Sequence, residues 1–495
     1  MRNAINRRDF LKRSALATVA AATAATSLDA LAVGRESLRR KGAAKRVVII
    51  GAGLAGMAAA YELAQAGHDV TILEARTRAG GRVRTLREPF SDGLYAEAGA
   101  SYIPDHHDWT MKYVKLFELP LLEIEPRNLA SLYYVRGKKI KLKKGVPIEW
   151  PVELTPDEKK LGLKGMMEKY VYSILDEMGD AAAPDWPPAR LKKYDDMTMT
   201  EFMLSRGASP AAVSLLRLGY LDINGDGVDS YSALSQLRDS ALLSKQNQEY
   251  QIKGGLDLLP KAFAARLADK IHYGSPVVRV EHDVKGVRVV FMQAGTRVSI
   301  TGDRLLCAIP FSTLKQIEVA PVFSPEKRQA IEQLPYTSVA RVYLQSRKRF
   351  WIDEGLSGQC ATDLPIMNVY DAAANQPGKR GLLESFMAGP QARRVTGMKE
   401  GERINYTLEQ ALRLYPALRE NFEGGATKCW DEDEWSRGDY AWFKPGQLQG
   451  LLPHIARAEG RVHFAGEHAS AWPGWMQGAL ESGNRAAREI NEAAS

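Results

Sequence analysis

One stretch near the N-terminus, KRVVIIGAGLAGMAAAYELAQAGHDVTILEAR, constrains the fold of this chain more than any other. Its four β-branched residues at 47–50 predict a buried strand, and MAAAYELAQAG, ended by Gly67, predicts an amphipathic helix. DVTILE then predicts a second strand with Glu74 at its end. The turn between the first strand and the helix reads G-x-G-x-x-G. This order of elements predicts a βαβ unit within an α/β fold.

The spacing of the glycines in this unit is typical of dinucleotide binding. Gly51 permits the tight turn, Gly53 lets the backbone approach a pyrophosphate, and Gly56 lets helix and strand pack closely. The helix N-terminus adds free N–H groups for the phosphates. Glu74 follows Gly51 by 23 residues, near the roughly 20 of the fingerprint, and can accept both hydroxyl hydrogen bonds of an adenosine ribose. Its carboxylate would repel a 2′-phosphate, so NADP is disfavoured.

A second glycine-rich stretch, RTRAGGRVRT, follows at once. Gly80 and Gly81 allow another close backbone approach to a diphosphate, with Arg82 as the counter-charge. Together with Ala75 and Arg76, they form the arrangement L-E-A-R-x-R-x-G-G-R. This arrangement resembles the glycine pair that follows the fingerprint in one branch of flavoproteins, and it favours FAD over NAD.

The C-terminal end resembles a known flavin-binding segment. GRVHFAGEHASAWPGWMQGALESGNRAAREI, residues 460–490, predicts a short strand over 462–464, a loop and a helix. The stretch is similar to the C-terminal flavin-binding segment of the flavin-containing amine oxidase family, which includes monoamine oxidases and L-amino acid oxidases. The resemblance runs from residue 45 to 492, is strong at both ends and is looser between 125 and 235.

The resemblance implies which residues bind FAD. Glu467, preceded by Gly466, would lie near the ribityl–phosphate part of FAD, and the backbone of Val278 would meet its adenine side. The segment WSRGDYAWF would lie beneath the flavin ring. The other residues implied to contact the cofactor are Gly99, Ala100, Trp435, Gly474, Trp475, Met476 and Ala479. Monoamine oxidases carry a cysteine in the WSRGDYAWF segment that is bonded to the flavin, and because Asp439 stands at that position, we expect FAD to be non-covalent.

The resemblance also points to a substrate site. Tyr440 and Trp475 match the two aromatic residues that flank the substrate amine in front of the flavin. Tyr370, in ATDLPIMNVY, matches a tyrosine that helps hold the substrate carboxylate in L-amino acid oxidases, whereas Tyr102 stands where many of those enzymes carry an arginine. Arg341 replaces a lysine that positions a water near flavin N5 in many members. Arg341 could supply the missing carboxylate partner, or it could slow the reaction with O₂ and leave a dehydrogenase.

The expected fold is α/β, with a Rossmann-like FAD-binding domain built from residues 46–110, 240–300 and 430–495. A substrate-binding domain with a mixed sheet would use residues 111–124 and 301–429, and residues 125–239 would form a helical insertion. The implied reaction is oxidative deamination of an L-α-amino acid by hydride transfer to flavin N5, giving the keto acid, ammonia and H₂O₂, with O₂ as electron acceptor. A primary amine or polyamine as substrate, another electron acceptor, and a homodimer all stay open.

The first residues predict export. NRRDFLKRSA carries adjacent arginines ahead of a weakly apolar stretch that ends in Ala-Leu-Ala, so residues 1–32 are typical of a twin-arginine signal and 33–45 of a basic linker. The protein would be periplasmic or extracellular, with no stable membrane span. Residues 1–32 carry a net charge of +3 and residues 33–46 carry +5, which accounts for the whole +8 of the chain. A broad nucleic-acid-binding face is therefore not expected.

No metal site is predicted. DINGDGVDSYSA imitates a calcium loop from Asp222, but its twelfth position is Ala233 rather than glutamate. His463 and His468 are five residues apart across a strand and turn, so they do not share a helix face. The three cysteines have no metal-binding spacing. The basic run at 136–145 alternates like an exposed hairpin.

Overall fold

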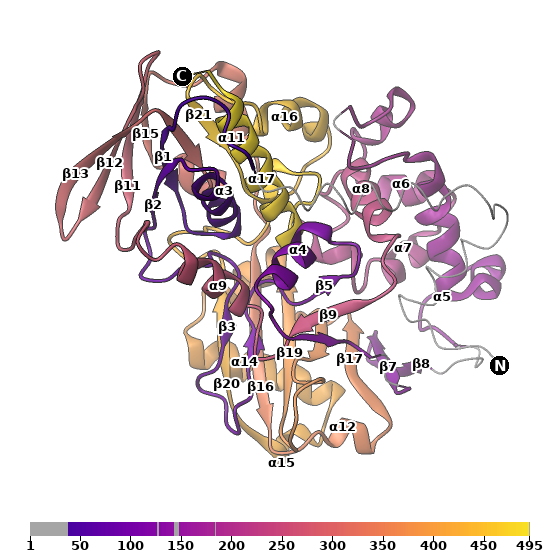
Figure 1. Cartoon of the computed structure of the whole chain (residues 1–495). Coiled ribbons are helices and arrows are strands. Elements are labelled where there is room, and N and C mark those ends of the chain that lie inside the picture. The colour runs from indigo at the N-terminus through magenta and orange to yellow at the C-terminus, as the bar shows by residue number, and fades with distance from the viewer. Residues whose placement is uncertain (1–37, 126–127, 143–147, 184, 495) are drawn as a thin grey trace, which may run out of the picture.

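The predicted βαβ unit forms as expected (Figure 1). The computed structural model describes residues 38–494 except 126–127, 143–147 and 184. Within it, β1 (Arg46–Ile50), α3 (Leu54–Gln65) and β2 (Asp69–Leu73) follow in order. The strand at the C-terminal end and the following helix are also confirmed, as β21 (Val462–Phe464) and α17 (Met476–Glu492).

The two ends of the chain meet in one parallel sheet. Its strand order is β10 (Ile271–His272), β2, β1, β14 (Arg304–Cys307) and β21. β1 is buried on both faces after its first residue, because helices cover one face and a second sheet covers the other. On the helical face, α17 crosses α3 so closely that a Cβ on Gly483 would lie 2.3 Å from the carbonyl oxygen of Ala55. The fold is therefore α/β, as predicted.

The second sheet has four strands. It is built from β13 (Thr296–Gly302), β12 (Val287–Gln293), β11 (Val277–His282) and β15 (Glu318–Ala320). β11 and β12 pair antiparallel, which confirms the two strands expected in SPVVRVEHDVKGVRVVF.

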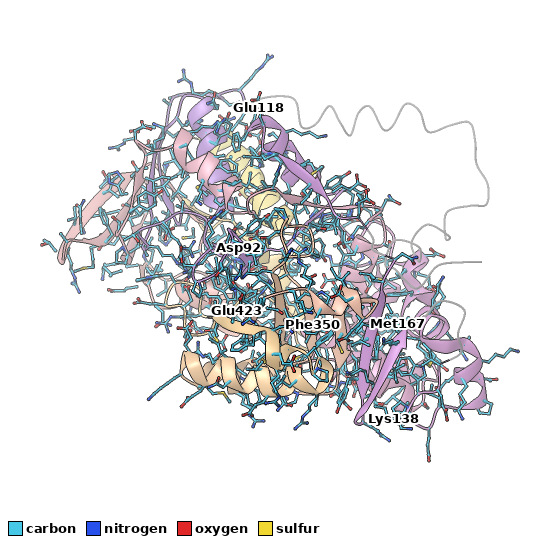
Figure 2. All side chains as sticks on the ribbon, turned by 90° about the horizontal axis from the view of Figure 1, so that it is seen from below. Asp92, Glu118, Lys138, Met167, Phe350 and Glu423 are labelled. Atoms are coloured by element: carbon cyan, nitrogen blue, oxygen red, sulfur yellow. The ribbon has the colours of Figure 1, made fainter. Side chains whose placement is uncertain are left out.

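A seven-stranded mixed sheet forms the lower lobe in Figure 1. Its order is β20 (Phe422–Cys429), β16 (Val339–Ser346), β19 (Gly381–Ala388), β18 (Asn368–Asp371), β17 (Leu356–Thr362), β7 (Ala130–Val135) and β8 (Lys138–Leu142). β16 and β19 are neighbours in this sheet, and both are buried along their whole length. The predicted basic hairpin is the pair β7 and β8, and Lys138 stands at its exposed turn (Figure 2).

A group of short helices lies beside this sheet. Its members are α5 (Pro156–Tyr170), η1 (Tyr172–Glu177), η2 (Ala189–Tyr194), α6 (Met199–Ser205), α7 (Pro210–Leu216), η3 (Leu221–Ile223) and α8 (Ala233–Leu243). Thr155 and Glu158 form a capping box at the start of α5. α8 differs from the others because all of its residues are buried. It therefore lies inside the molecule, between the other short helices and the parallel-sheet domain.

Other elements complete the lobes. Around the parallel sheet they are α4 (Asp108–Leu116), α9 (Leu258–Arg266), α10 (Phe311–Leu314), α11 (Pro325–Gln333), α16 (Gln447–Ile455) and η4 (Glu467–Ala469). Around the seven-stranded sheet they are α12 (Phe350–Asp353), α13 (Gly389–Thr396), α14 (Glu400–Leu414) and α15 (Leu418–Asn421). Two small sheets pair β3 (Thr85–Leu86) with β4 (Ala96–Glu97), and β5 (Ile103–Pro104) and β6 (Leu121–Glu123) with β9 (Glu249–Ile252).

The structure moves several predicted domain boundaries. β14 and β15 lie beyond the predicted boundary at residue 300, yet β14 pairs with β1 and β15 with β11, so both belong to the FAD-binding domain. α4, assigned in part to the substrate-binding domain, packs on α17 instead, and the Tyr113 hydroxyl hydrogen-bonds Glu62 of α3 at 2.7 Å. The predicted helical insertion begins with the β7–β8 hairpin of the seven-stranded sheet. These domain boundaries are set by strand pairing and helix packing between segments that are distant in the sequence, and the local sequence pattern does not predict such contacts.

The predicted export signal, residues 1–32, lies outside the described residues. The described part of the predicted linker runs along the parallel-sheet domain: the Lys41 ammonium pairs with Glu492 of α17 at 2.7 Å, and the Lys45 ammonium donates to the Asn491 carbonyl at 3.1 Å. None of the helices among the described residues has the length and apolar character needed to cross a bilayer.

Candidate active site

A cavity of about 320 Å³ runs along the carboxyl ends of β2, β1 and β14. Carboxyl ends of parallel strands are where open α/β sheets bind ligands. Seven segments that line the cavity were expected from the sequence. They are the turn after β1, the end of β2, the second glycine pair, the start of β11, the segment from Trp435 to Tyr440, the loop after β21 and the start of α17. Of the residues predicted to bind the cofactor, those that line it are Gly51, Gly53, Glu74, Ala75, Arg76, Gly80, Gly81, Arg82, Ala100, Val278, Trp435, Gly466, Glu467, Gly474, Trp475, Met476 and Ala479.

The turn after β1 leaves room for a ligand. Gly51 has a φ of +100°, and a Cβ there would lie 2.8 Å from Ile309. A Cβ on Gly53 would meet no atom within 4 Å, which means that this position faces open space. Gly56 does not line the cavity; a Cβ there would lie 2.0 Å from the carbonyl oxygen of Gly51. Gly53 therefore faces the ligand space, and Gly56 serves the close packing of helix and turn.

Glu74 closes one end of the cavity. One of its carboxylate oxygens accepts the N–H of Ala52 at 2.7 Å and the other accepts the N–H of Arg76 at 2.8 Å. Burial raises the pKa of Glu74, although both backbone hydrogen bonds oppose this shift. Each carboxylate oxygen has a further lone pair, so the group can also accept two hydroxyl hydrogen bonds from a ribose.

The second glycine pair packs directly on this turn. The Gly80 N–H donates to the Ala52 carbonyl at 2.8 Å, and a Cβ on Gly81 would lie 3.5 Å from the Gly53 Cα. Gly99 lies outside the cavity wall, where a Cβ would overlap the carbonyl oxygen of Arg82 at 1.7 Å. The glycines at 80, 81 and 99 thus let three backbone segments approach one another beside the cavity.

Two arginines of the site already have carboxylate partners. Arg82 pairs with Glu467 at 2.9 Å and also donates to the Asp439 carbonyl. Arg76 pairs with Asp433 and donates to the Ser436 hydroxyl at 2.9 Å. These ion pairs join the turn after β2 to the segments near residues 435 and 467, so they close the far wall of the cavity.

The N-terminus of α17 forms another wall. Trp475 has extended backbone angles, so the helix begins at Met476, and Met476 and Ala479 line the cavity. The Gly474 N–H donates to Glu467 at 2.9 Å, which holds the turn in place. Free N–H groups of the first helical turn are suited to an electron-rich ligand atom. Together with Glu74 and Gly53, this arrangement fits FAD.

Asp439 lines the cavity where a covalent flavin link would need a cysteine. Burial raises its pKa to about 6, against the opposing charges of Arg341 and Arg82. A carboxyl group cannot form the thioether that a cysteine forms. Cys307, Cys360 and Cys429 are buried outside the cavity wall.

Aromatic side chains gather at the other end of the cavity. Tyr440 and Trp475 both line it, and a Cβ on Gly474 would lie 3.5 Å from the Tyr440 ring. The Tyr102 ring meets the Trp475 ring edge-on at 5.3 Å, and Tyr370 packs in one small cluster with Tyr440. Tyr102 and Tyr370 therefore adjoin the predicted aromatic pair without lining the cavity.

His107 also belongs to this aromatic end, although the sequence analysis did not single it out. Its ring contacts those of Trp475 and Trp472, each at 5.0 Å. Burial lowers the pKa of His107 to about 2, so the ring is neutral.

Arg341 does not lie where a partner of the substrate carboxylate would have to lie. It lies on β16, outside the cavity wall, and its guanidinium pairs with Glu384 of β19 at 3.2 Å. The same nitrogen donates to the Ser101 hydroxyl at 2.8 Å and to the Glu97 carbonyl at 3.0 Å. Burial lowers the pKa of Arg341, but Glu384, Tyr343 and Asp439 together outweigh burial, so the pKa is raised. The positive charge of Arg341, which a substrate carboxylate would need, is thus already paired with Glu384.

Three further parts of the wall were not predicted. They are Ala308, Ile309 and Pro310 after β14, Thr313, Gln316 and Ile317 in and after α10, and residues 275–277 at the start of β11, ahead of the predicted Val278. The first group follows a buried strand directly, and a strand parallel to β1 ends at the same edge of the sheet. That signal was present in DRLLCAIPF, but the pairing with β1 had to be known.

The acidic residues of the calcium-loop-like segment, and His463, pair with other side chains of the protein. Asp222 pairs with Arg217 at 3.1 Å and Asp226 pairs with Arg393 at 2.7 Å, in a polar loop between η3 and α8. His463 lies against Glu489 of α17 at 3.2 Å. Within the described ranges, no three His, Cys, Asp or Glu side chains gather as metal ligands would.

Comparison with known proteins adds a family and a set of relatives. The model of the family described as flavin-containing amine oxidoreductase matches residues 54–491. The chain is 36% identical to a putative L-amino-acid oxidase, YobN, of Bacillus subtilis over 94% of this chain and 98% of that protein. It is 29% identical to an L-amino-acid oxidase of Demansia vestigiata over 93% of this chain and 89% of that protein.

Solved structures share the fold. Cyclohexylamine oxidase from Brevibacterium oxydans has a TM-score of 0.77 and 22% identity, over 91% of this chain and 99% of that chain. A putrescine oxidase bound to putrescine has a TM-score of 0.75 and 24% identity, over 92% and 99%.

Proposed function

This chain belongs to the flavin-containing amine oxidoreductase family, and from that premise we propose that it deaminates an L-α-amino acid with non-covalently bound FAD. The observation that carries the proposal is the continuity of the cavity. One space connects Glu74, suited to a ribose, with Tyr440 and Trp475, suited to a substrate amine. A flavin nucleotide is the cofactor whose two ends would occupy such a space at once.

Bound FAD supplies the two-electron acceptor for the hydride that leaves the amine-bearing carbon. Tyr440 and Trp475 would hold the substrate between aromatic walls and exclude water. The Tyr440 ring is held in place because its hydroxyl donates to the Ile223 carbonyl. Hydrolysis of the imine product releases ammonia and a keto acid, and O₂ is reduced to H₂O₂. In total, the amino acid, O₂ and water give the keto acid, ammonia and H₂O₂.

Different observations favour two substrate classes. Relatives that match nearly the whole chain are named L-amino-acid oxidases, which supports an amino acid. The ion pair between Arg341 and Glu384, and Tyr102 beside Trp475, favour a primary amine or polyamine as the second candidate. The reason is that an α-carboxylate would need a cation or several donors when it is buried.

An anaerobic titration tests the proposal and separates the two classes. The visible flavin band of the holoprotein is followed while an L-amino acid or its decarboxylated amine is added, in several matched pairs. Bleaching by the amino acids supports the first class, and bleaching by the amines alone supports the second. A flavin that neither class reduces would refute the proposed function. Readmitting air then separates the oxidase from a dehydrogenase, because only the oxidase recovers its colour rapidly.

The bond to the cofactor has its own test. Because Asp439 replaces the linking cysteine, acid precipitation should release all the FAD into the supernatant. Flavin retained in the washed precipitate would show a covalent link elsewhere in the chain.

We also propose that residues 1–32 direct export by the twin-arginine route. Arg7→Lys together with Arg8→Lys should leave the protein in the cytoplasm, with normal flavin content. Unchanged amounts in the exported fraction would contradict this proposal.

A further inference from the structure

Helix α8 carries a buried carboxylate that the proposed chemistry does not use. One oxygen of Asp239 accepts the Tyr231 hydroxyl at 3.1 Å, and Tyr231 in turn accepts the Ser235 hydroxyl at 3.1 Å. Within the described part of the chain, Asp239 forms no ion pair with Lys, Arg or His. Its sequence neighbour Arg238 points elsewhere, donating to the Ala181 carbonyl at 2.8 Å with its guanidinium 4.5 Å from the Trp186 ring centre.

Within the described part of the chain, the other oxygen of Asp239 accepts no hydrogen bond. The residue keeps 9% of its surface accessible, although it lies in the middle of a fully buried helix. Burial raises the pKa of Asp239 to about 7, while the Tyr231 hydroxyl and the Arg238 charge oppose the shift. A carboxylate that is desolvated and lacks a cationic partner is costly unless a ligand supplies the charge.

The first end of α8 is attached to the Tyr440 side of the active site. The Ser232 N–H donates to the Phe443 carbonyl at 2.9 Å. The Tyr231 ring, which carries the hydroxyl bound to Asp239, stacks on Trp442 with 6.0 Å between ring centres. The Tyr440 hydroxyl donates to the carbonyl of Ile223, the last residue of η3, from which the loop leads into α8.

The second end of α8 adjoins the Trp475 side. The Leu242 carbonyl lies beside His106, and the Asp105 N–H donates to the Gln248 carbonyl at 2.9 Å. His106 contacts His107, whose ring lies 5.0 Å from that of Trp475. α8 therefore spans the distance between the two aromatic walls. In Figure 1 it is the helix of its group that lies on the side of α4 and α17.

Asp239 stands between these two attachments. Ser235, Asp239 and Leu242 share one face of α8, because residues three and four apart lie above one another on a helix. Ser235 is on the Tyr231 side and Leu242 on the His106 side. The acid thus lies on the helix that bridges the walls, away from the predicted position of the reacting carbon.

We propose that Asp239 is a specificity-determining residue that binds a second, positively charged group of the substrate, remote from the amine that is oxidised. The inference rests on the proposed function. The preferred substrates are then diamines or basic L-amino acids, which share an ammonium group at the end of an aliphatic chain.

The experiment compares substrates that differ only in the terminal ammonium group. Values of kcat/KM are measured with the holoenzyme at pH 8.5 for L-lysine against L-norleucine, and for cadaverine against n-pentylamine. We expect the wild type to prefer the charged member at least tenfold in the pair that it oxidises. Asp239→Asn should reduce this preference by about 10- to 100-fold, the range of one buried charge-assisted hydrogen bond, and should change kcat/KM for the neutral member less than threefold.

Asp229→Asn is the matched control. It makes the same chemical change in the loop before α8, but Asp229 is 57% exposed and pairs with Arg217 at 2.8 Å. The preference should be unchanged in this variant. An Asp239→Asn enzyme that keeps the wild-type preference, or a wild type that treats both members alike, overturns the assignment. A wild type whose flavin is reduced by other L-amino acids or amines but by no member of either pair also overturns the assignment, whereas a flavin that no L-amino acid and no amine reduces overturns the proposed function itself.

A second measurement needs no variant. Between pH 8.5 and pH 6 the preference of the wild type should fall about tenfold, because Asp239 becomes protonated while the terminal ammonium group stays charged. Tyr231 and Arg238, the titratable groups that act on Asp239, do not change charge in this range. The reacting amine is common to both members of a pair, so its own ionisation cancels in the ratio. A preference that does not depend on pH would refute the role of Asp239.

Discussion

The ion pair between Arg341 and Glu384 offers the sharpest test of the substrate end. Both side chains are nearly inaccessible, at 7% and 9% exposure, and their charged atoms lie 3.2 Å apart. Arg341→Met keeps the length of the side chain and removes its charge. Glu384 then remains as a buried carboxylate without a partner, while the Ser101 hydroxyl and the Glu97 carbonyl each lose a hydrogen bond.

The cost follows from these contacts. Removing one partner of a buried ion pair destabilises a protein by about 3–5 kcal/mol, mostly through the charge that is left behind. Arg341→Met combined with Glu384→Gln removes both charges, so most of this loss should be recovered. Urea denaturation of the holoproteins, followed by far-UV circular dichroism, measures the order of stability: wild type, then the double variant, then Arg341→Met.

Activity separates a structural role of Arg341 from substrate binding. Because the guanidinium is committed to Glu384, we expect the double variant to change kcat/KM for an L-amino acid and for its decarboxylated amine by a similar factor. If Arg341 instead binds the substrate carboxylate, the double variant should lose about 100-fold or more with the amino acid and little with the amine, the scale of a charge-assisted pair. That selective loss would refute the structural reading of Arg341.

Two further predictions concern the cofactor end, and a third concerns a buried carboxyl group of β4. Glu74→Gln should weaken FAD binding about 10- to 100-fold in a fluorescence titration of the apoprotein, because an amide nitrogen would face the N–H of Ala52 or Arg76; unchanged affinity would contradict this. Gly56→Ala should abolish the folded holoprotein, because its Cβ would overlap the carbonyl oxygen of Gly51 at 2.0 Å. The control Gly53→Ala should fold, with reduced FAD affinity, because a Cβ there meets no protein atom within 4 Å. A stable Gly56→Ala holoprotein would exclude this packing. Burial raises the pKa of Glu97 to about 7, so its contribution to stability is complete at acidic pH and is lost as the pH rises through 7, about 3 kcal/mol in all. Glu97→Gln should therefore gain thermal stability relative to wild type between pH 5 and 8.5, and parallel pH profiles would show that Glu97 is not the group responsible.

The cofactor end could be predicted from the sequence in most of its detail. Glycine spacing and strand periodicity are local properties. Gly51, Gly53 and Glu74 were predicted from their positions within one βαβ unit, and all three line the cavity. Trp475 and Met476 were predicted from the resemblance of the C-terminal segment to a known flavin-binding segment, and both line the cavity at the start of α17. For these residues the neighbours that matter are close in sequence or belong to a recognisable motif.

The domain boundaries and the rest of the wall could not be predicted in this way. β14 became part of the parallel sheet through pairing with β1, more than 250 residues earlier in the chain, and this pairing brought Ala308 and Pro310 to the cavity. No periodicity within DRLLCAIPF specifies its partner strand. Parallel pairing is a contact between distant segments, so the sequence of either segment alone does not contain it.

The sequence by itself determined the α/β class and the glycine-rich turn after β1, because both depend on local spacing and on the absence of a Cβ at particular positions. The residues at the start of α17 were indicated by the resemblance of their segment to a known family. Only the tertiary structure decided the electrostatic state of the substrate end. Arg341 is matched by Glu384 because β16 and β19 pair antiparallel, and Asp239 is left without a cation because Arg238 points to the other side of α8. The charge of a buried group depends on what the fold places beside it, and that is a property of three-dimensional packing rather than of residue order.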